Sequence, residues 1–185
     1  MKTRTLANSC AAGLLAAVFP LAHAFDPVPD GIAVQAGAGD SGTAMAGVGV
    51  LWDWDFWRIR PKTELTAHTE LMLNRWQGDA VGGGHQGYTQ VVLLPTVRMR
   101  FGQGGSPWFW EVGIGASWMD KKFQTPEKEF STRWNFYDVI GAGYTFGGSR
   151  GTHEINIRWV HVSNGGIRKP NPGQDFGQLR YVAWF

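Results

Sequence analysis

The chain has 185 residues, of which 43% are hydrophobic, 14% aromatic and only 17% charged, with a formal net charge of +2. So many aromatic and so few charged residues exclude a disordered protein, and the length fits a single domain. A mean hydropathy of -0.20, with no long apolar run after the N-terminus, excludes a bundle of transmembrane helices. The 10 tryptophans and 26 glycines favour a β-protein, because glycine weakens helices and aromatic residues favour strands.

The N-terminus has the features of a secretory signal peptide. Lys2 and Arg4 precede an apolar stretch, and Ala22-His23-Ala24 matches an A-x-A cleavage site. The apolar stretch is too short for a stable transmembrane anchor. We therefore expect residues 1–24 to be cleaved and residues 25–185 to form a single domain.

Cleavage changes both the charge and the cysteine content. Without Lys2 and Arg4 the 17 basic residues become 15, equal to the 15 acidic residues, so the charge gives no indication of nucleic-acid binding. The single cysteine, Cys10, is also removed, which excludes a disulfide-stapled secreted module. No cluster of cysteine and histidine has zinc-ligand spacing, so we expect neither a metal site nor a cofactor.

Apolar and polar residues alternate through most of the mature chain with the period of two that is typical of a β-strand. Within 44–56 the even-numbered positions are apolar, whereas the odd-numbered ones include two glycines and two aspartates. The same split recurs in 64–76 and 108–118, and glycine-rich segments separate the runs. The pattern predicts strands near 31–39, 44–56, 63–76, 88–101, 108–118, 133–146, 153–163 and 176–185.

The contents of the two faces favour a transmembrane barrel over a water-soluble lipocalin-like barrel. The apolar face carries the large aromatic and branched residues, whereas the polar face mixes glycines with charged residues: Glu64, Glu70, Arg98, Glu111, Glu154 and Arg180. The interior of an eight-stranded barrel is narrow enough for paired charges to fill it, while the outer face meets lipid. The C-terminal Phe185 resembles the sorting signal of bacterial outer-membrane proteins. We predict an all-β fold, an eight-stranded antiparallel transmembrane β-barrel in the bacterial outer membrane.

Two polar residues interrupt the apolar face of the strand expected at 153–163. By parity, His161 and Ser163 share the lipid-facing side with Ile157 and Trp159. Residues i and i+2 of a strand lie about 6–7 Å apart on one face, so an imidazole can reach a hydroxyl. A base beside a serine is the arrangement that makes the serine nucleophilic. Two polar side chains at the membrane interface would give the same pattern.

The glycine- and proline-rich connection that follows brings further polar groups back to this point. Hairpin geometry places Asp175 beside His161 or Ser163, where a carboxylate could orient the imidazole. The glycine amides and Asn171 could donate hydrogen bonds to an oxyanion. Asp138 also has outward parity and is a rival or supporting acid.

The segment 161–173, HVSNGGIRKPNPG, resembles the signature of the PagL-type lipid A 3-O-deacylases, which are outer-membrane esterases with a Ser-His-acid triad on an eight-stranded barrel. The likeness extends over most of the mature chain, including the WDWD segment 52–55 and the segment 135–143. It implies that Ser163 is the nucleophile, His161 the general base and Asp175 the acid, a position where the family commonly has glutamate.

The resemblance also implies the surroundings of the triad and the substrate. Asn171 and the Gly166 amide match the oxyanion hole, with Asn164 as support. The expected reaction is hydrolysis of the ester-linked acyl chain at position 3 of lipid A, in the outer leaflet, through an acyl-enzyme and without a cofactor. Arg168 and Lys169 either contact lipid A phosphates or are simply solvated.

Two other functions and one assembly state stay open. An outer-membrane phospholipase would use similar chemistry on glycerophospholipids. A small structural or adhesive barrel would share the fold without being an enzyme. The sequence also leaves a homodimer open, and it gives no reason to expect nucleic acid as a partner.

Overall fold

The computed structural model describes residues 26–60, 62–147 and 152–185, so the predicted signal peptide lies outside it. Within these ranges the chain forms eight strands and one short 3₁₀ turn, η1 (Gly102–Gly104). The strands are β1 (Gly31–Gly39), β2 (Ala44–Arg60), β3 (Thr63–Asp79), β4 (His85–Phe101), β5 (Trp108–Met119), β6 (Trp134–Phe146), β7 (His153–Ser163) and β8 (Gln174–Trp184).

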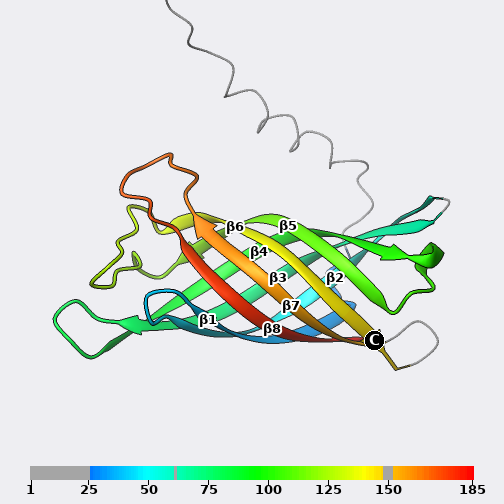
Figure 1. The fold of residues 1–185 in the computed structure, drawn as a ribbon, viewed down its shortest axis with the longest axis horizontal. Helices are drawn as coiled ribbons and strands as arrows, with labels where there is room; N and C mark the ends of the chain where they lie inside the picture. The colour runs from blue at the N-terminus through cyan, green and yellow to red at the C-terminus, as the bar shows by residue number, and fades with distance from the viewer. Residues whose placement is uncertain (1–25, 61, 148–151) are drawn as a thin grey trace, which may run out of the picture.

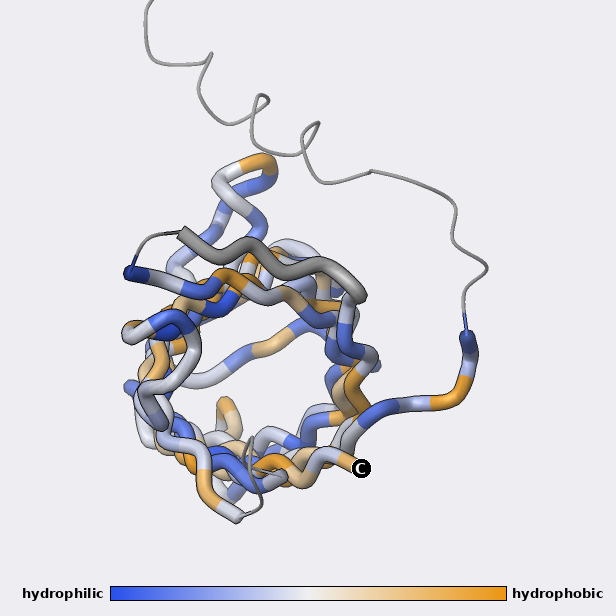
Figure 2. Tube along the Cα trace, turned by 90° about the vertical axis from the view of Figure 1, so that its right-hand side faces the viewer, coloured by the Kyte–Doolittle hydropathy of each residue, from blue (hydrophilic) through white to orange (hydrophobic). Residues whose placement is uncertain are grey.

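Each strand pairs with the next, and β8 pairs with β1 to close the barrel. All of these pairs are antiparallel. Figure 1 shows the tilted strands from the side, and Figure 2, which looks along the barrel, shows that they form a closed ring. The predicted fold is therefore confirmed. The strands β2, β3 and β4 have 17 residues each and extend beyond their predicted limits.

The outer face of the barrel is apolar. On β5, the even-numbered Trp108, Trp110 and Ile114 are exposed, whereas the odd-numbered Glu111 and Ser117 are buried in the interior. Other strands repeat this alternation with exposed apolar residues that include Val34, Val48, Leu73, Leu93, Ile140, Ile157 and Leu179. An apolar outer band around a polar interior is the pattern of a barrel that spans a membrane with its strands.

No helix among the described residues is long and apolar enough to cross a membrane.

Ala67 on β3 departs from the predicted faces. Parity places it outward with Leu71, but only 1% of its surface is exposed. The register between β2 and β3 shifts between Asp53 and Trp57, so the three residues 54–56 lie opposite Ala67 alone. A bulge of this kind bends the strand locally and interrupts the simple alternation.

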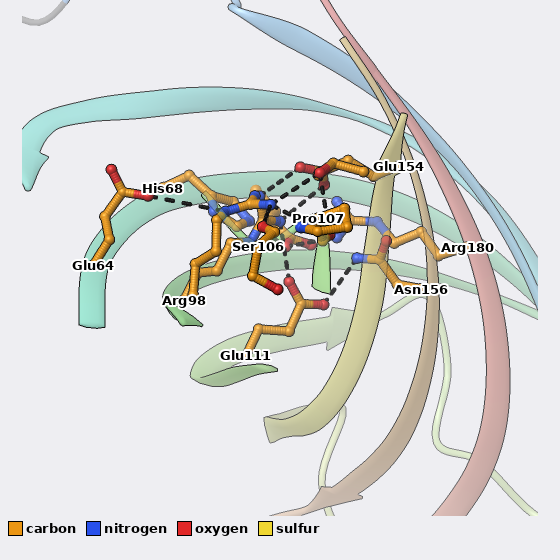
Figure 3. A network of polar contacts seen from close by, with 12 residues as sticks. Glu64, His68, Arg98, Ser106, Pro107, Glu111, Glu154, Asn156 and Arg180 are labelled. Carbon is orange, nitrogen blue, oxygen red and sulfur yellow. Dashed lines mark hydrogen bonds and ion pairs between the residues drawn. The ribbon is translucent and has the colours of Figure 1, made fainter. Parts of the chain in front are cut away.

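Paired charges fill the middle of the lumen, as the polar face predicted. The network consists of Glu70, Arg98, Glu111, Glu154, Arg158 and Arg180, all buried. Arg158 joins its two halves, because its Nη2 donates to Glu70 at 2.8 Å and its Nε donates to Glu111 at 2.5 Å. Figure 3 shows four of these side chains, Arg98, Glu111, Glu154 and Arg180, converging from separate strands. Three arginines balance three glutamates, so the charges compensate one another in an interior that excludes bulk water.

Aromatic side chains close one end of the lumen. Trp76 lies between Phe176 and Phe123, with ring centroids at 4.6 and 5.4 Å, and Phe123 contacts Phe130 at 5.2 Å. Phe123 and Phe130 belong to the β5–β6 loop, residues 120–133, which folds back on itself through a hydrogen bond from Phe130 N to Phe123 O at 2.9 Å. We call this group, together with Tyr88, the aromatic plug. It fixes the β5–β6 loop beside the β7–β8 connection.

Candidate active site

The residues singled out on the β7–β8 hairpin meet at one end of the barrel. His161 and Ser163 are the last two positions of β7 whose parity is outward, and Asp175 is the second residue of β8. In the register of these strands His161 lies directly opposite Asp175. Figure 1 shows the β7–β8 connection at the end of the barrel opposite the C-terminus. The hairpin therefore gathers the three side chains at the rim of the outer face.

His161 and Asp175 form a hydrogen-bonded pair. Nδ1 of the imidazole lies 2.7 Å from Oδ1 of the carboxylate, and the side chains are 31% and 44% exposed. An ionised carboxylate can only accept a hydrogen bond, so Nδ1 donates. Nε2 is then the basic nitrogen of the neutral ring, which is the tautomer that a general base needs.

Ser163 lies two residues beyond His161 but is more buried than its parity predicts. Only 7% of it is exposed, and its Oγ accepts a hydrogen bond from the Gly165 amide at 3.3 Å. Within the described residues no hydrogen bond joins Ser163 to His161. Bonds of this type are often long in a free enzyme and tighten when substrate binds.

Two further groups restrict the His161 ring. Trp159 lies alongside it, with centroids 5.8 Å apart and planes within 17° of parallel. Gly173, at φ +71°, lies so close that a Cβ there would be 2.6 Å from His161 Cε1. Sequence reasoning did not single out Gly173, because nothing in the spacing shows which glycine of the connection faces the imidazole.

The β7–β8 connection is ordered around Asn164. The backbone N–H of Asn164 donates to Oδ1 of Asn171 at 3.0 Å. Oδ1 of Asn164 accepts a hydrogen bond from the backbone N–H of Gly166 at 3.0 Å. Asn171 therefore directs its carbonyl oxygen toward Asn164. In the described part of the chain its Nδ2 group makes no protein hydrogen bond. The Gly166 N–H, which the resemblance implied as an oxyanion donor, is occupied by Asn164 in this conformation.

Asp138 flanks His161 on the other side. It lies opposite His161 in the β6–β7 register, so the histidine has a carboxylate on each neighbouring strand. Only Asp175 forms a hydrogen bond with the imidazole among the contacts of the described residues. This geometry favours Asp175 over Asp138 as the acid that orients His161.

The remaining residues fall into two groups. Arg168 and Lys169 project from the exposed part of the connection, and the Arg168 carbonyl accepts hydrogen bonds from Asn164 and Ser131. Ser131, like its neighbour Thr132, belongs to the β5–β6 loop and was missed by sequence reasoning. These two residues precede Asn164 by 33 and 32 positions, a separation that leaves no periodic signal.

No group of three or more histidine, cysteine, aspartate or glutamate side chains that could hold a metal ion occurs in the part of the chain that the structure describes.

The fold and the site together define a class of protein, an eight-stranded barrel with a polar serine–histidine–aspartate cluster on its outer rim. A model of the lipid A 3-O-deacylase (PagL) family matches residues 42–183. The chain belongs to this family.

Individual relatives agree with this assignment. The chain is 27% identical to the lipid A deacylase PagL of Pseudomonas aeruginosa over 169 residues, which cover 91% of this chain and 93% of that protein. It is 30% identical to the lipid A deacylase PagL of Bordetella bronchiseptica over 163 residues, 86% of this chain and 85% of that protein. A crystal structure of the outer membrane enzyme PagL superimposes with a TM-score of 0.72 at 25% identity, covering 84% of this chain and 99% of that one.

Proposed function

We propose that this protein is an outer-membrane lipid A 3-O-deacylase that hydrolyses the ester-linked acyl chain at position 3 of lipid A. The observation that carries the proposal is the pair formed by His161 Nδ1 and Asp175 Oδ1, 2.7 Å apart at one end of the barrel, with Ser163 two residues from His161 in the sequence. Family membership supplies the substrate class, and the pair supplies the chemistry for cleaving an ester.

In the acylation step, Ser163 Oγ attacks the ester carbonyl carbon while His161 Nε2 removes the hydroxyl proton. Asp175 keeps Nδ1 protonated and stabilises the imidazolium that forms. The tetrahedral intermediate then collapses, the bond from the carbonyl carbon to the sugar oxygen breaks, and His161 returns the proton to that oxygen. The products of this step are a free hydroxyl at position 3 and an acyl-enzyme on Ser163.

In the deacylation step, water takes the place of the serine. His161 removes a proton from the water as the water oxygen attacks the acyl carbon. The bond between the acyl carbon and Ser163 Oγ then breaks. The proton passes to Ser163 Oγ, and the fatty acid leaves. The overall reaction therefore consumes only lipid A and water, and neither step uses a cofactor or a metal.

The negative oxygen of both intermediates needs a donor that is not already engaged. The Nδ2 group of Asn171 is suited to this role, because its Oδ1 is fixed on the Asn164 amide. The Gly166 amide could join it only after leaving Asn164 Oδ1. We therefore assign Asn171 as the first donor, Gly166 as a second donor after rearrangement, and Asn164 as their support. Preorganised donors of this type typically contribute about 10²–10³ in rate each.

The location of the site supports the outer leaflet as its place of action. The C-terminus and the β7–β8 connection lie at opposite ends of the barrel (Figure 1). With the C-terminus on the periplasmic side, the cluster faces sideways into the outer leaflet, and lipid A reaches Ser163 without leaving the membrane. Arg168 and Lys169, exposed on the same connection, are placed to attract the phosphates of lipid A.

Mass spectrometry of the products tests this function. Purified protein in mixed micelles should convert lipid A to a species that lacks one 3-hydroxyacyl chain at position 3 and should leave glycerophospholipids intact. Release of fatty acid from glycerophospholipid alone would indicate the phospholipase alternative. No hydrolysis of either lipid by folded protein would indicate a structural or adhesive barrel.

A further inference from the structure

Asn164, in the β7–β8 connection, is held by a second loop that is distant from it in the sequence. It is 1% exposed, and its Nδ2 donates to Ser131 Oγ at 3.0 Å and to Thr132 Oγ1 at 3.2 Å. The Arg168 carbonyl is a third acceptor at 2.7 Å. The oxygen of the same carboxamide, Oδ1, accepts a hydrogen bond from the Gly166 N–H. This one side chain thus connects the β5–β6 loop to the backbone that follows Ser163.

The two hydroxyls can only accept from Asn164. Ser131 Oγ donates its hydrogen to the Arg168 carbonyl at 2.8 Å, and Thr132 Oγ1 donates its hydrogen to Asn135 Oδ1 at 3.2 Å. A hydroxyl has one hydrogen and two lone pairs, so both present lone pairs to Asn164. A carboxamide turned by 180° would place its own oxygen against those lone pairs. The hydroxyls therefore fix which end of Asn164 faces Gly166.

The β5–β6 loop is buried at Ser131 and Thr132 and anchored beside them, as a support must be. Ser131 and Thr132 are 6% and 7% exposed and directly follow Phe130, which is anchored in the aromatic plug. The loop also holds the β7–β8 connection at two other points. Ser131 N donates to the Pro170 carbonyl at 3.2 Å, and Lys128 Nζ donates to the Gly173 carbonyl at 3.0 Å.

We propose that Ser131 and Thr132 are positioning residues for the hydrolysis of lipid A, which they support through Asn164. They hold its carboxamide and thereby place the backbone of Asn164, whose N–H fixes the Asn171 side chain beside Ser163. The inference rests on the function proposed above, because it needs Asn171 to face the reacting ester.

Removal of both hydroxyls should leave Asn164 short of acceptors. Nδ2 carries two hydrogens, and the Arg168 carbonyl then remains as its protein acceptor. A buried N–H without a partner is costly, so the connection should shift to expose or re-pair it. That shift would move Asn171 away from the geometry that stabilises the intermediate, which would slow the chemical step more than it weakens lipid binding.

Kinetics on four variants test the proposal: Ser131→Ala, Thr132→Val, the double variant and Thr132→Ser. We expect kcat to fall about 2–5-fold in the single variants Ser131→Ala and Thr132→Val, and about 10–100-fold in the double variant. KM for lipid A in mixed micelles should stay within about twofold, because no substrate contact is lost. Thr132→Ser keeps the hydroxyl and should retain kcat near the original value. Thr125→Val is the matched control, because Thr125 is buried in the same loop and its hydroxyl contacts neither Asn164 nor the β7–β8 connection among the described hydrogen bonds, but accepts from Lys128 N.

A mutant cycle with Asn164→Ala separates positioning from a general loss of structure. If the hydroxyls act through Asn164, adding Ser131→Ala and Thr132→Val to Asn164→Ala should change kcat by less than about twofold. Losses that multiply in the triple variant would contradict the proposal.

Two further results keep the test decisive. Heat-modifiable migration on a denaturing gel reports whether each barrel is folded, and a folded double variant with unchanged kcat would overturn the inference. Should the double variant not fold, kcat of Thr132→Val is compared with kcat of Thr132→Ser. Equal values of kcat in these two variants would overturn the inference. Ser163→Ala is measured in parallel, because activity in that variant would refute the proposed mechanism rather than the role of the β5–β6 loop.

Discussion

A Cβ at Gly173 would lie 2.6 Å from Cε1 of His161, so only glycine fits beside the imidazole in this conformation. Gly173→Ala should therefore displace the ring from Asp175 and lower kcat for lipid A hydrolysis by at least about tenfold. Gly84→Ala is the matched control, because Gly84 has a similar φ of +75° but no atom within 4 Å of the point that an added Cβ would occupy. Equal activities of the two folded variants would show that the contact with His161 does not matter.

The identity of the acid can be tested by removing one charge at a time. Asp175→Asn should lower kcat by about 10²–10⁴, because an amide no longer enforces the productive tautomer of His161. Asp138→Asn should cost less than about tenfold, since Asp138 forms no described hydrogen bond with the ring. Asp175→Glu should retain activity. If Asp138→Asn is the more damaging change, the acid has been assigned to the wrong strand.

Removal of one carboxylate from the charge network in the lumen should destabilise the barrel, because it leaves buried arginines without a partner. Glu111→Gln leaves Arg158 and Arg98 without one carboxylate, and such a loss in a buried network typically costs about 3–5 kcal/mol. Glu64→Gln is the control, because its pair with Arg100 is long, at 3.9 Å, and partly exposed. Its loss should cost less than about 1 kcal/mol. Urea unfolding of the purified barrels, followed by gel mobility, measures both, and similar midpoints would contradict the prediction.

Cysteine labelling can test whether the face of β7 that carries His161 points toward lipid or into the lumen. In a chain that lacks Cys10, the one natural cysteine, a cysteine at Ile157 should react with an apolar, membrane-partitioned maleimide, because Ile157 is 70% exposed on the outer face. A cysteine at Val160, which is 0% exposed, should be protected. Val160 is a safer interior probe than Arg158, whose loss would break the charge network. Preferential labelling at Val160 would place His161 inside the barrel and out of reach of a lipid.

The sequence predicted those parts of the structure that depend on local periodicity. Alternation placed Glu111 inside and Trp110 outside, and hairpin geometry brought Asp175 beside His161 or Ser163, of which the register of β7 and β8 selects His161. Parity failed at Ala67, because a register shift in β2 lies opposite it. It also did not predict the burial of Ser163, which depends on how the β7–β8 connection folds.

The support from the β5–β6 loop could not have been predicted. The contacts of Ser131 and Thr132 with Asn164 are hydrogen bonds between irregular segments more than 30 residues apart, and their spacing follows no repeat. The state of the Gly166 amide was equally out of reach, because its choice of partner depends on the orientation of one carboxamide. Periodicity places side chains on a face but does not orient the loops that complete a site.

The central claim is that Ser163 is the nucleophile that cleaves the ester, and its removal tests this most directly. We predict that folded Ser163→Ala releases 3-hydroxy fatty acid from lipid A at least about 10³-fold more slowly than the unmodified protein. His161→Ala should show a similar loss, and the double variant should be little worse than either, because the two residues act as a unit. Mass spectrometry of lipid A after timed incubation gives these rates. Release by folded Ser163→Ala at a rate near that of the unmodified protein would contradict the account.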